Sequence, residues 1–109
     1  MTYQELKDEE QLYLMHTYGR FPAALDHGKG ATLWDIDGKK YIDLTSGIGV
    51  SSLGHDNEAL VSALNEQAHK LLHASNLYLT EPMVQVAKEL VTSCGMGKIF
   101  FSNSGAEAN

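Results

Sequence analysis

The sequence of 109 residues carries eight basic and 14 acidic side chains, which gives a net charge of −6 when histidine is neutral. Its hydrophobic fraction of 43% indicates a globular protein rather than a disordered one. The acidic balance and the lack of a basic cluster argue against a nucleic-acid binder and against a protein that binds acidic membranes.

The N-terminal segment gives no sign of a targeting sequence. Residues 1–10 are acidic and contain no apolar run, unlike a secretory signal or an arginine-rich transit peptide. No stretch approaches the roughly 18 apolar residues of a membrane span. The single cysteine, Cys94, excludes an internal disulfide and fits a reducing compartment. We therefore expect a cytoplasmic protein that binds neither nucleic acid nor membrane.

Residues 3 to about 15 predict an amphipathic helix. Thr2 and Glu5 have the spacing of a capping box, and apolar residues follow at loosely helical intervals. The segment from His16 to Asp26 is expected to be irregular, because Gly19 and Pro22 interrupt any periodicity.

The next pattern predicts a β-hairpin. The β-favouring runs 32–35 and 40–44 flank Ile36-Asp37-Gly38-Lys39. Asp-Gly at this position is a strong turn signal because both central residues of such a turn can take positive φ. Two strands are marginally stable alone, so the hairpin is expected to need a partner sheet or helix.

Residues 46–55 are rich in glycine and serine around a few apolar side chains. This composition is typical of a sharply bending segment whose backbone closely approaches another group. A plain flexible linker is an equally open interpretation. His55, which follows Gly54, is interpreted as a turn or packing residue.

Two amphipathic helices are predicted next. The first covers residues 58–72 with Asp56 or Asn57 as its cap, and a loop covers residues 73–79. The second helix is capped by Thr80, carries Pro82 in its first turn and ends at Gly95.

The last dozen residues predict a strand, a tight turn and the start of a helix. Ile99 to Ser102 is short, apolar and β-favouring, so it predicts a buried strand. Ser104 and Glu107 have capping-box spacing. Free amides at a helix N-terminus beside a hydroxyl and a glycine can hold a phosphate. Simple capping without a ligand is the alternative. The final helix–strand–helix order indicates the entrance to an α/β domain with a mostly parallel sheet.

The amino-acid sequence of the C-terminal turn favours phosphate binding over simple capping. Asn103-Ser-Gly-Ala-Glu-Ala-Asn109 resembles the phosphate-binding signature of class III aminotransferases, which use pyridoxal 5′-phosphate (PLP). In that family the Ser-Gly-Ala turn holds the cofactor phosphate. The resemblance therefore assigns PLP binding to Ser104, Gly105 and Ala106.

Longer stretches extend this resemblance over nearly the whole chain. The hairpin pattern Trp-Asp-x-x-Gly-Lys-x-Tyr-x-Asp at residues 34–43 and the Gly54–His55 pair are shared across the family. Residues 18–22 and 76–82 point towards its acetylornithine and succinylornithine branch. Ser51 departs from that branch, whose members often carry asparagine there.

The resemblance implies a homodimer of fold type I. Residues 1–55 would belong to the small domain, and residues 56–109 would open the large PLP-binding domain. The implied reaction moves an amino group between N-acetylornithine and 2-oxoglutarate, with glutamate as donor in arginine biosynthesis. Substrate or interface contacts would come from residues of two loops: Gly47, Ile48, Asn76 and Tyr78.

The catalytic lysine and the acid beside the pyridine nitrogen lie well downstream in this family. The chain has seven lysines, and none lies in a stretch that resembles the one around the family's catalytic lysine: Lys7, Lys29, Lys39, Lys40, Lys70, Lys88 and Lys98. We therefore assign no catalytic residue. The chain is expected to be an N-terminal fragment, because it stops within a helix that has just begun.

Several alternatives stay open. His69 and His73 have i, i+4 spacing on a predicted helix, but no third ligand is evident, and we predict no metal site.

Within the family, succinylornithine, ornithine or 4-aminobutyrate could be the amino donor instead. Outside enzymes, the chain could be a short non-catalytic module for phosphate binding or dimerisation.

Overall fold

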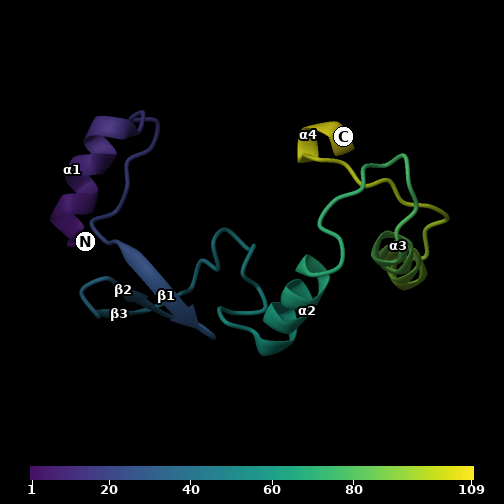
Figure 1. Ribbon diagram of the computed structural model, residues 1–109, viewed down its shortest axis with the longest axis horizontal. Helices are drawn as coiled ribbons and strands as arrows, with labels where there is room; N and C mark the ends of the chain where they lie inside the picture. The colour runs from purple at the N-terminus through teal and green to yellow at the C-terminus, as the bar shows by residue number, and fades with distance from the viewer. The chain divides into compact units, whose positions relative to one another are not determined.

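The computed structural model describes residues 1–109, which form two compact units, residues 1–67 and residues 68–109. The first unit holds α1 (Tyr3–Tyr13), a three-stranded sheet and nearly all of α2 (Glu58–Ala68). The second unit holds α3 (Glu81–Cys94) and α4 (Gly105–Ala108), as Figure 1 shows. All four helices are too short or too polar to span a membrane.

Helix α1 confirms the predicted N-terminal helix and its cap. The Glu5 amide donates a hydrogen bond to the Thr2 hydroxyl at 3.2 Å, and the Thr2 amide donates to the Glu5 carboxylate at 2.7 Å. The capping box therefore satisfies two donors that a helix leaves unpaired at its N-terminus.

The sheet is antiparallel with strand order β1-β2-β3. It contains β1 (Leu25–Lys29), β2 (Thr32–Asp35) and β3 (Lys40–Ile42). The predicted hairpin is confirmed as β2 and β3, and β1 supplies the partner strand that the hairpin needs. Strand β1 was not predicted, because its polar and glycine residues have low strand propensity. Gly28 is required there, since a Cβ would lie 2.8 Å from a methyl group of Leu33.

The turn between β2 and β3 uses one left-handed residue rather than the two that we expected. Gly38 has φ of +79°, whereas Asp37 is not left-handed. The Gly38 amide donates to the Asp35 carbonyl at 2.9 Å, and the Asp35 amide donates to the Lys39 carbonyl at 3.1 Å. This is a three-residue hairpin loop in which the glycine takes the position with positive φ.

Asp35 holds this turn together with its side chain. The residue is only 7% exposed. One carboxylate oxygen accepts the amides of Asp37 and Lys39 at 3.1 and 2.8 Å, and the other accepts the Tyr41 hydroxyl at 2.6 Å. The Tyr41 hydrogen bond, aided by the two amides, lowers the pKa of Asp35 although burial opposes the shift. The same bond raises the pKa of Tyr41.

The helices α2 and α3 confirm most of the predicted boundaries. Asn57 caps α2, because its side-chain oxygen accepts the Leu60 amide at 3.0 Å. The helix ends at Ala68, four residues before the predicted end. Thr80 stands at the N-cap of α3 without a side-chain hydrogen bond, and Gly95 ends that helix with φ of +71°.

The predicted strand at residues 99–102 is wrong. These residues form no regular element, and Phe100 is 77% exposed. A strand is stabilised by backbone pairing with a neighbour, and residues 68–109 contain no other strand. The predicted loop at residues 73–79, in contrast, is confirmed.

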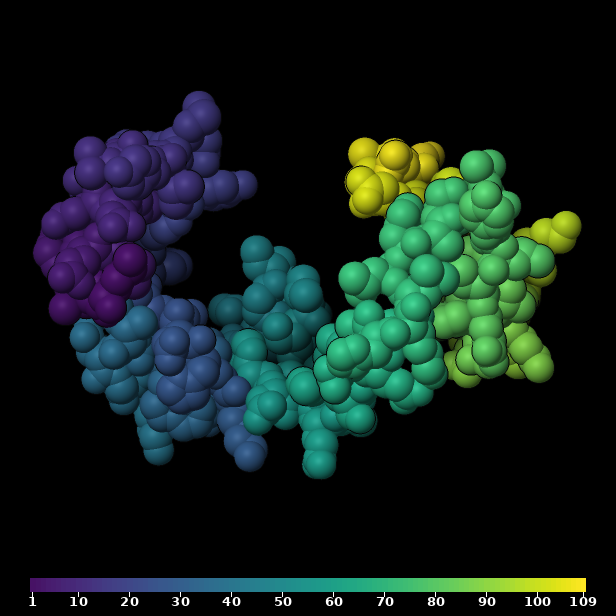
Figure 2. Space-filling view, viewed as in Figure 1, coloured from purple at the N-terminus to yellow at the C-terminus, as the bar shows by residue number.

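No apolar side chain of the chain is fully buried. Large apolar residues stay exposed along its whole length, where Figure 2 identifies each segment by colour; among the most exposed are Phe21, Leu44, Ile48, Val50, Leu77 and Leu79. Each such side chain forgoes about 1.5–3 kcal/mol that burial would contribute. Local hydrogen bonds therefore hold the elements in place without an apolar core.

The exposed apolar surface predicts that the isolated 109-residue chain lacks cooperative stability. We expect a broad thermal change in far-ultraviolet circular dichroism and little near-ultraviolet signal, because no packed core has to be disrupted. The natural protein that carries this chain, measured in parallel, should unfold with a sharp transition. A sharp transition in the isolated chain would contradict the prediction.

The Asp35–Tyr41 hydrogen bond predicts a pH-dependent effect of Tyr41→Phe in the natural protein. Because the folded-state pKa of Asp35 is lowered, its stabilising contribution is present above the unfolded value of about 3.9 and is lost as pH falls through the folded-state pKa. Tyr41→Phe should therefore lower the urea midpoint most above about pH 4, and less in stronger acid.

The control for this experiment is Tyr13→Phe, which removes an exposed hydroxyl on α1. It should leave the urea midpoint unchanged at every pH. A Tyr41→Phe effect of equal size at pH 3 and pH 7 would show that the carboxylate charge plays no part.

Candidate functional site

The C-terminal turn has the geometry of a helix N-terminus open to a ligand. Ser104 is the N-cap of α4 in extended backbone, and its hydroxyl accepts the Glu107 amide at 3.3 Å. The amides of Gly105 and Ala106 lie in the first turn, where a helix provides no backbone acceptor. A Cβ at Gly105 would meet no atom within 4 Å.

This donor set fits a phosphate group. Two free amides and a hydroxyl converge at the positive end of a short helix, and the space beside Gly105 is open. One group opposes an anion there, because the Ser104 hydroxyl donates to the Glu107 carboxylate at 3.1 Å. The hydroxyl must turn from Glu107 to the ligand for Ser104 to bind a phosphate. The expected full capping box is half formed, since Glu107 contacts the hydroxyl rather than the Ser104 amide.

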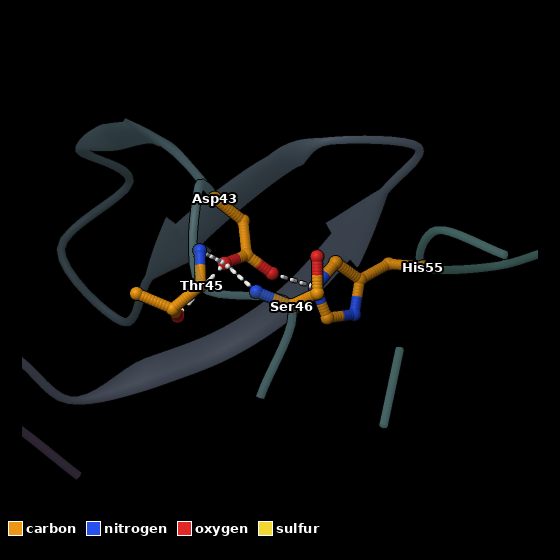
Figure 3. A network of polar contacts seen from close by, with 4 residues as sticks. All are labelled: Asp43, Thr45, Ser46 and His55. Carbon is orange, nitrogen blue, oxygen red and sulfur yellow. Dashed lines mark hydrogen bonds and ion pairs between the residues drawn. The ribbon is translucent and has the colours of Figure 1, made fainter. Parts of the chain in front are cut away.

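A second polar site lies around Asp43 in the first unit. One carboxylate oxygen accepts the amides of Thr45 and Ser46 at 3.0 and 2.8 Å, and also the Thr45 hydroxyl at 3.1 Å. The other oxygen lies 2.8 Å from His55 Nε2, as Figure 3 shows. An ionised carboxylate only accepts hydrogen bonds, so Nε2 carries the proton in this pair.

These contacts keep Asp43 ionised. Its side chain is 6% exposed, and that of His55 is 26% exposed. The hydrogen bond from His55, followed by the Ser46 amide and the Thr45 donors, lowers the pKa of Asp43 to about 2 although burial opposes the shift. Asp43 is therefore a fixed negative charge at neutral pH that orients the backbone around it.

His55 is attached to the sheet as well as to Asp43. Its amide and carbonyl form two hydrogen bonds with Gly30, at 2.9 and 2.8 Å, in an isolated antiparallel bridge. Its ring covers Gly28, where a Cβ would lie 2.7 Å from His55 Cγ. Gly54 also approaches Gly30 so closely that a Cβ would lie 3.1 Å from its Cα. The close backbone approach predicted for this segment is thus confirmed, and the linker interpretation is wrong.

The loop between Asp43 and His55 contains a left-handed turn. Four consecutive residues have positive φ: Ser46 at +50°, Gly47 at +59°, Ile48 at +61° and Gly49 at +84°. Isoleucine rarely adopts this conformation, because its branched Cβ meets the backbone. Ile48 is 98% exposed at the tip of the turn. A hollow of about 290 Å³ is lined in part by Asp43, Ser46 and Ser51 of this segment.

The loop before α3 holds the other residues singled out by the sequence. Ser75 has φ of +59°, and its hydroxyl and carbonyl accept the amides of Leu77 and Tyr78 at 3.2 and 3.4 Å. This turn leaves Tyr78 67% exposed. Asn76 and Tyr78 thus belong to the same unit as Ser104, whereas Gly47 and Ile48 belong to the first unit.

The structure changes what we expected of His69 with His73 and of His55. His69 and His73 lie beyond the end of α2, so their spacing does not place them on one helix face. His55 packs on the sheet, as interpreted, but it also pairs with Asp43, which sequence reasoning missed. The available signal was that Asp43, Thr45 and Ser46 directly follow a predicted strand, because these residue types favour side-chain capping of a turn.

Known proteins resemble this chain in sequence and structure. Residues 13–109 match the family described as Aminotransferase class-III. The chain is 50% identical over all 109 residues to the acetylornithine aminotransferase of Haemophilus ducreyi and spans 28% of that protein. The crystal structure of acetylornithine aminotransferase from Elizabethkingia anophelis is 32% identical with a TM-score of 0.93, over 99% of this chain and 28% of that one.

The same fold occurs in an aminotransferase for a different substrate. The taurine:2-oxoglutarate aminotransferase of Bifidobacterium kashiwanohense, solved in complex with PLP and glutamate, has a TM-score of 0.86 at 30% identity. It covers 100% of this chain and 26% of that one. These likenesses confirm the expected α/β aminotransferase fold, of which this chain spans about 28% in the relatives it matches. The chain belongs to the class III aminotransferases, a family of PLP-dependent enzymes.

Proposed function

We propose that this chain is the N-terminal part of an enzyme that uses PLP to transfer an amino group between N-acetylornithine and 2-oxoglutarate. The observation that carries the proposal is the 50% identity to an acetylornithine aminotransferase over all 109 residues. That span includes residues 103–109, the motif for which we propose phosphate binding. Such an enzyme would make N-acetylornithine by moving the amino group of glutamate onto the corresponding aldehyde and releasing 2-oxoglutarate, in arginine biosynthesis in the cytoplasm.

The C-terminal turn is proposed to bind the phosphate of PLP. The amides of Gly105 and Ala106 and the hydroxyl of Ser104 are the donors, and the N-terminus of α4 adds a favourable field for an anion. When bound, PLP withdraws electrons from the amine to which it is joined. The role of these three residues is to anchor and orient the cofactor, while the catalytic lysine comes from outside this chain.

Two loops are proposed to contact the substrate or a second copy of the chain. The left-handed turn presents Gly47 and Ile48 to the exterior, and the Ser75 turn presents Asn76 and Tyr78. In a homodimer these exposed groups would be covered by substrate or by the partner subunit. Within the complete enzyme, residues 1–55 would form part of the small domain and residues 56–109 the start of the large domain.

The fold itself does not select the amino donor, because an aminotransferase for taurine shares it. Succinylornithine, ornithine and 4-aminobutyrate stay alternatives on that ground. The identity to acetylornithine aminotransferases over the entire chain favours N-acetylornithine. A short non-catalytic module for phosphate binding or dimerisation is the alternative outside enzymes, and in it the exposed apolar side chains would be covered by a second copy.

We predict that the purified natural protein prefers N-acetylornithine over ornithine in kcat/KM, with 2-oxoglutarate as acceptor. The 109-residue chain alone should show no turnover, because it supplies no catalytic lysine.

The intact mass of the natural protein, measured before and after borohydride reduction, checks the cofactor. It should greatly exceed the 11.9 kDa of this chain and gain a phosphopyridoxyl group. A natural mass of 11.9 kDa without this gain would support the non-catalytic module instead.

Ser104→Ala in the natural protein tests the phosphate contact. Losing a hydrogen bond to a charged group costs about 1.5–3 kcal/mol, so the dissociation constant for PLP should rise about 10- to 100-fold. Fluorescence titration of the cofactor-free protein measures this change. Ser93→Ala is the matched control, because the Ser93 hydroxyl bonds only within α3, to the Leu90 carbonyl. An unchanged affinity in Ser104→Ala would remove Ser104 from the proposed site.

A further inference from the structure

The left-handed turn at residues 46–49 is a strained element that points away from the chain. It is closed by the Gly49 amide, which donates to the Thr45 carbonyl at 3.2 Å, and by the Ser51 amide, which donates to the Ser46 carbonyl at 2.8 Å. Successive left-handed residues are costly for L-amino acids, above all at β-branched Ile48. Such strain persists only where the surroundings impose it.

Two contacts fix the ends of this turn. At its entry, the Asp43 carboxylate accepts the amides of Thr45 and Ser46, which sets the direction of the backbone. At its exit, the backbone of His55 is paired with Gly30 of the sheet. The hydrogen bond between Asp43 and His55 then joins entry to exit across residues 44–54.

The Asp43–His55 hydrogen bond and the backbone contacts at its two ends form a clamp on the turn. This clamp does not pack side chains within the chain. Ile48 is almost fully exposed at the tip, and Val50 beside it is exposed as well. The two hydrogen bonds that fix the turn therefore hold an apolar tip outward and bury no side chain of the turn. The strain is therefore retained for a contact that the turn makes with something else.

We propose that Asp43 and His55 are positioning residues that hold Gly47 and Ile48 in place for the substrate. This inference rests on the proposed function, which assigns substrate contact to these two loop residues. Asp43 and His55 touch no reacting atom themselves. They act through the backbone, by keeping the left-handed turn formed before the substrate arrives, so that binding does not have to order it.

His55→Leu and His55→Gln in the natural PLP-loaded enzyme separate positioning from general stability. Leucine removes the donor to Asp43, whereas the glutamine amide can still donate near the position of Nε2. His27→Leu is the matched control. His27 also pairs with an aspartate, Asp26, at 2.8 Å and lies on the same sheet, but it clamps no loop.

We expect His55→Leu to raise the KM for the amino donor about tenfold or more, with a smaller change in kcat and an unchanged PLP content. His55→Gln should restore most of the loss, and His27→Leu should leave KM unchanged. An unchanged KM in His55→Leu would overturn the proposal. Equal losses in both His55 variants that follow a loss of thermal stability would also overturn it.

Hydrogen–deuterium exchange provides a readout that does not depend on activity. The amides of residues 44–54 should exchange about tenfold faster in His55→Leu but not in His55→Gln or His27→Leu. Unchanged exchange in His55→Leu would overturn the clamp even if the kinetics changed. If the unsubstituted natural protein shows no aminotransferase activity, the proposed function fails. The exchange pattern then decides by itself whether the pair positions the turn.

Discussion

The hydrogen bond between Asp43 and His55 connects the three-stranded sheet to the loop that follows it. Asp43 comes directly after β3, and His55 pairs with Gly30 at the end of β1. Without this bond the ends of the loop would be held beside the sheet by backbone hydrogen bonds alone, from Asp43 to Ala31 and between His55 and Gly30. Both the left-handed turn and the hollow beside it depend on the bond, because Asp43 lines that hollow and fixes the backbone at Ser46.

Asp35, the last residue of β2, and Asp43, which follows β3, each order the turn that comes after them. Each carboxylate accepts three or four hydrogen bonds, at least two of them from backbone amides of the following turn. A charged acceptor forms stronger hydrogen bonds than a neutral one, and its several lone pairs allow many donors to converge. The two carboxylates thereby order residues 35–55 in a chain that has no buried apolar residue. Local electrostatics here takes the place that core packing has in an ordinary domain.

How far the sequence predicts this structure depends on the range of the interaction. Caps, the β2–β3 turn and the glycine that ends α3 were predictable because each is set by residues a few positions apart. Strand β1 was missed because pairing with β2 overrides the low propensity of residues such as Gly28. The strand expected at residues 99–102 fails for the converse reason, since favourable propensity cannot replace a missing neighbour. The Asp43–His55 pair joins residues twelve positions apart, so the candidate site could be predicted at Ser104 to Ala106 but not around Asp43.

The two proposed binding elements share a property that the apolar faces lack. The helix N-terminus at Ser104 is built by hydrogen bonds within residues 104–109, and the left-handed turn at Ile48 is built by hydrogen bonds among residues 43–55 and Gly30, so each takes its shape from polar contacts inside its own unit of the chain. The apolar faces of α2 and α3, in contrast, are exposed and gain stability only when another surface covers them. The geometry of both proposed binding elements is therefore set by hydrogen bonds within this chain, whereas its apolar faces need a further covering surface before they contribute to stability.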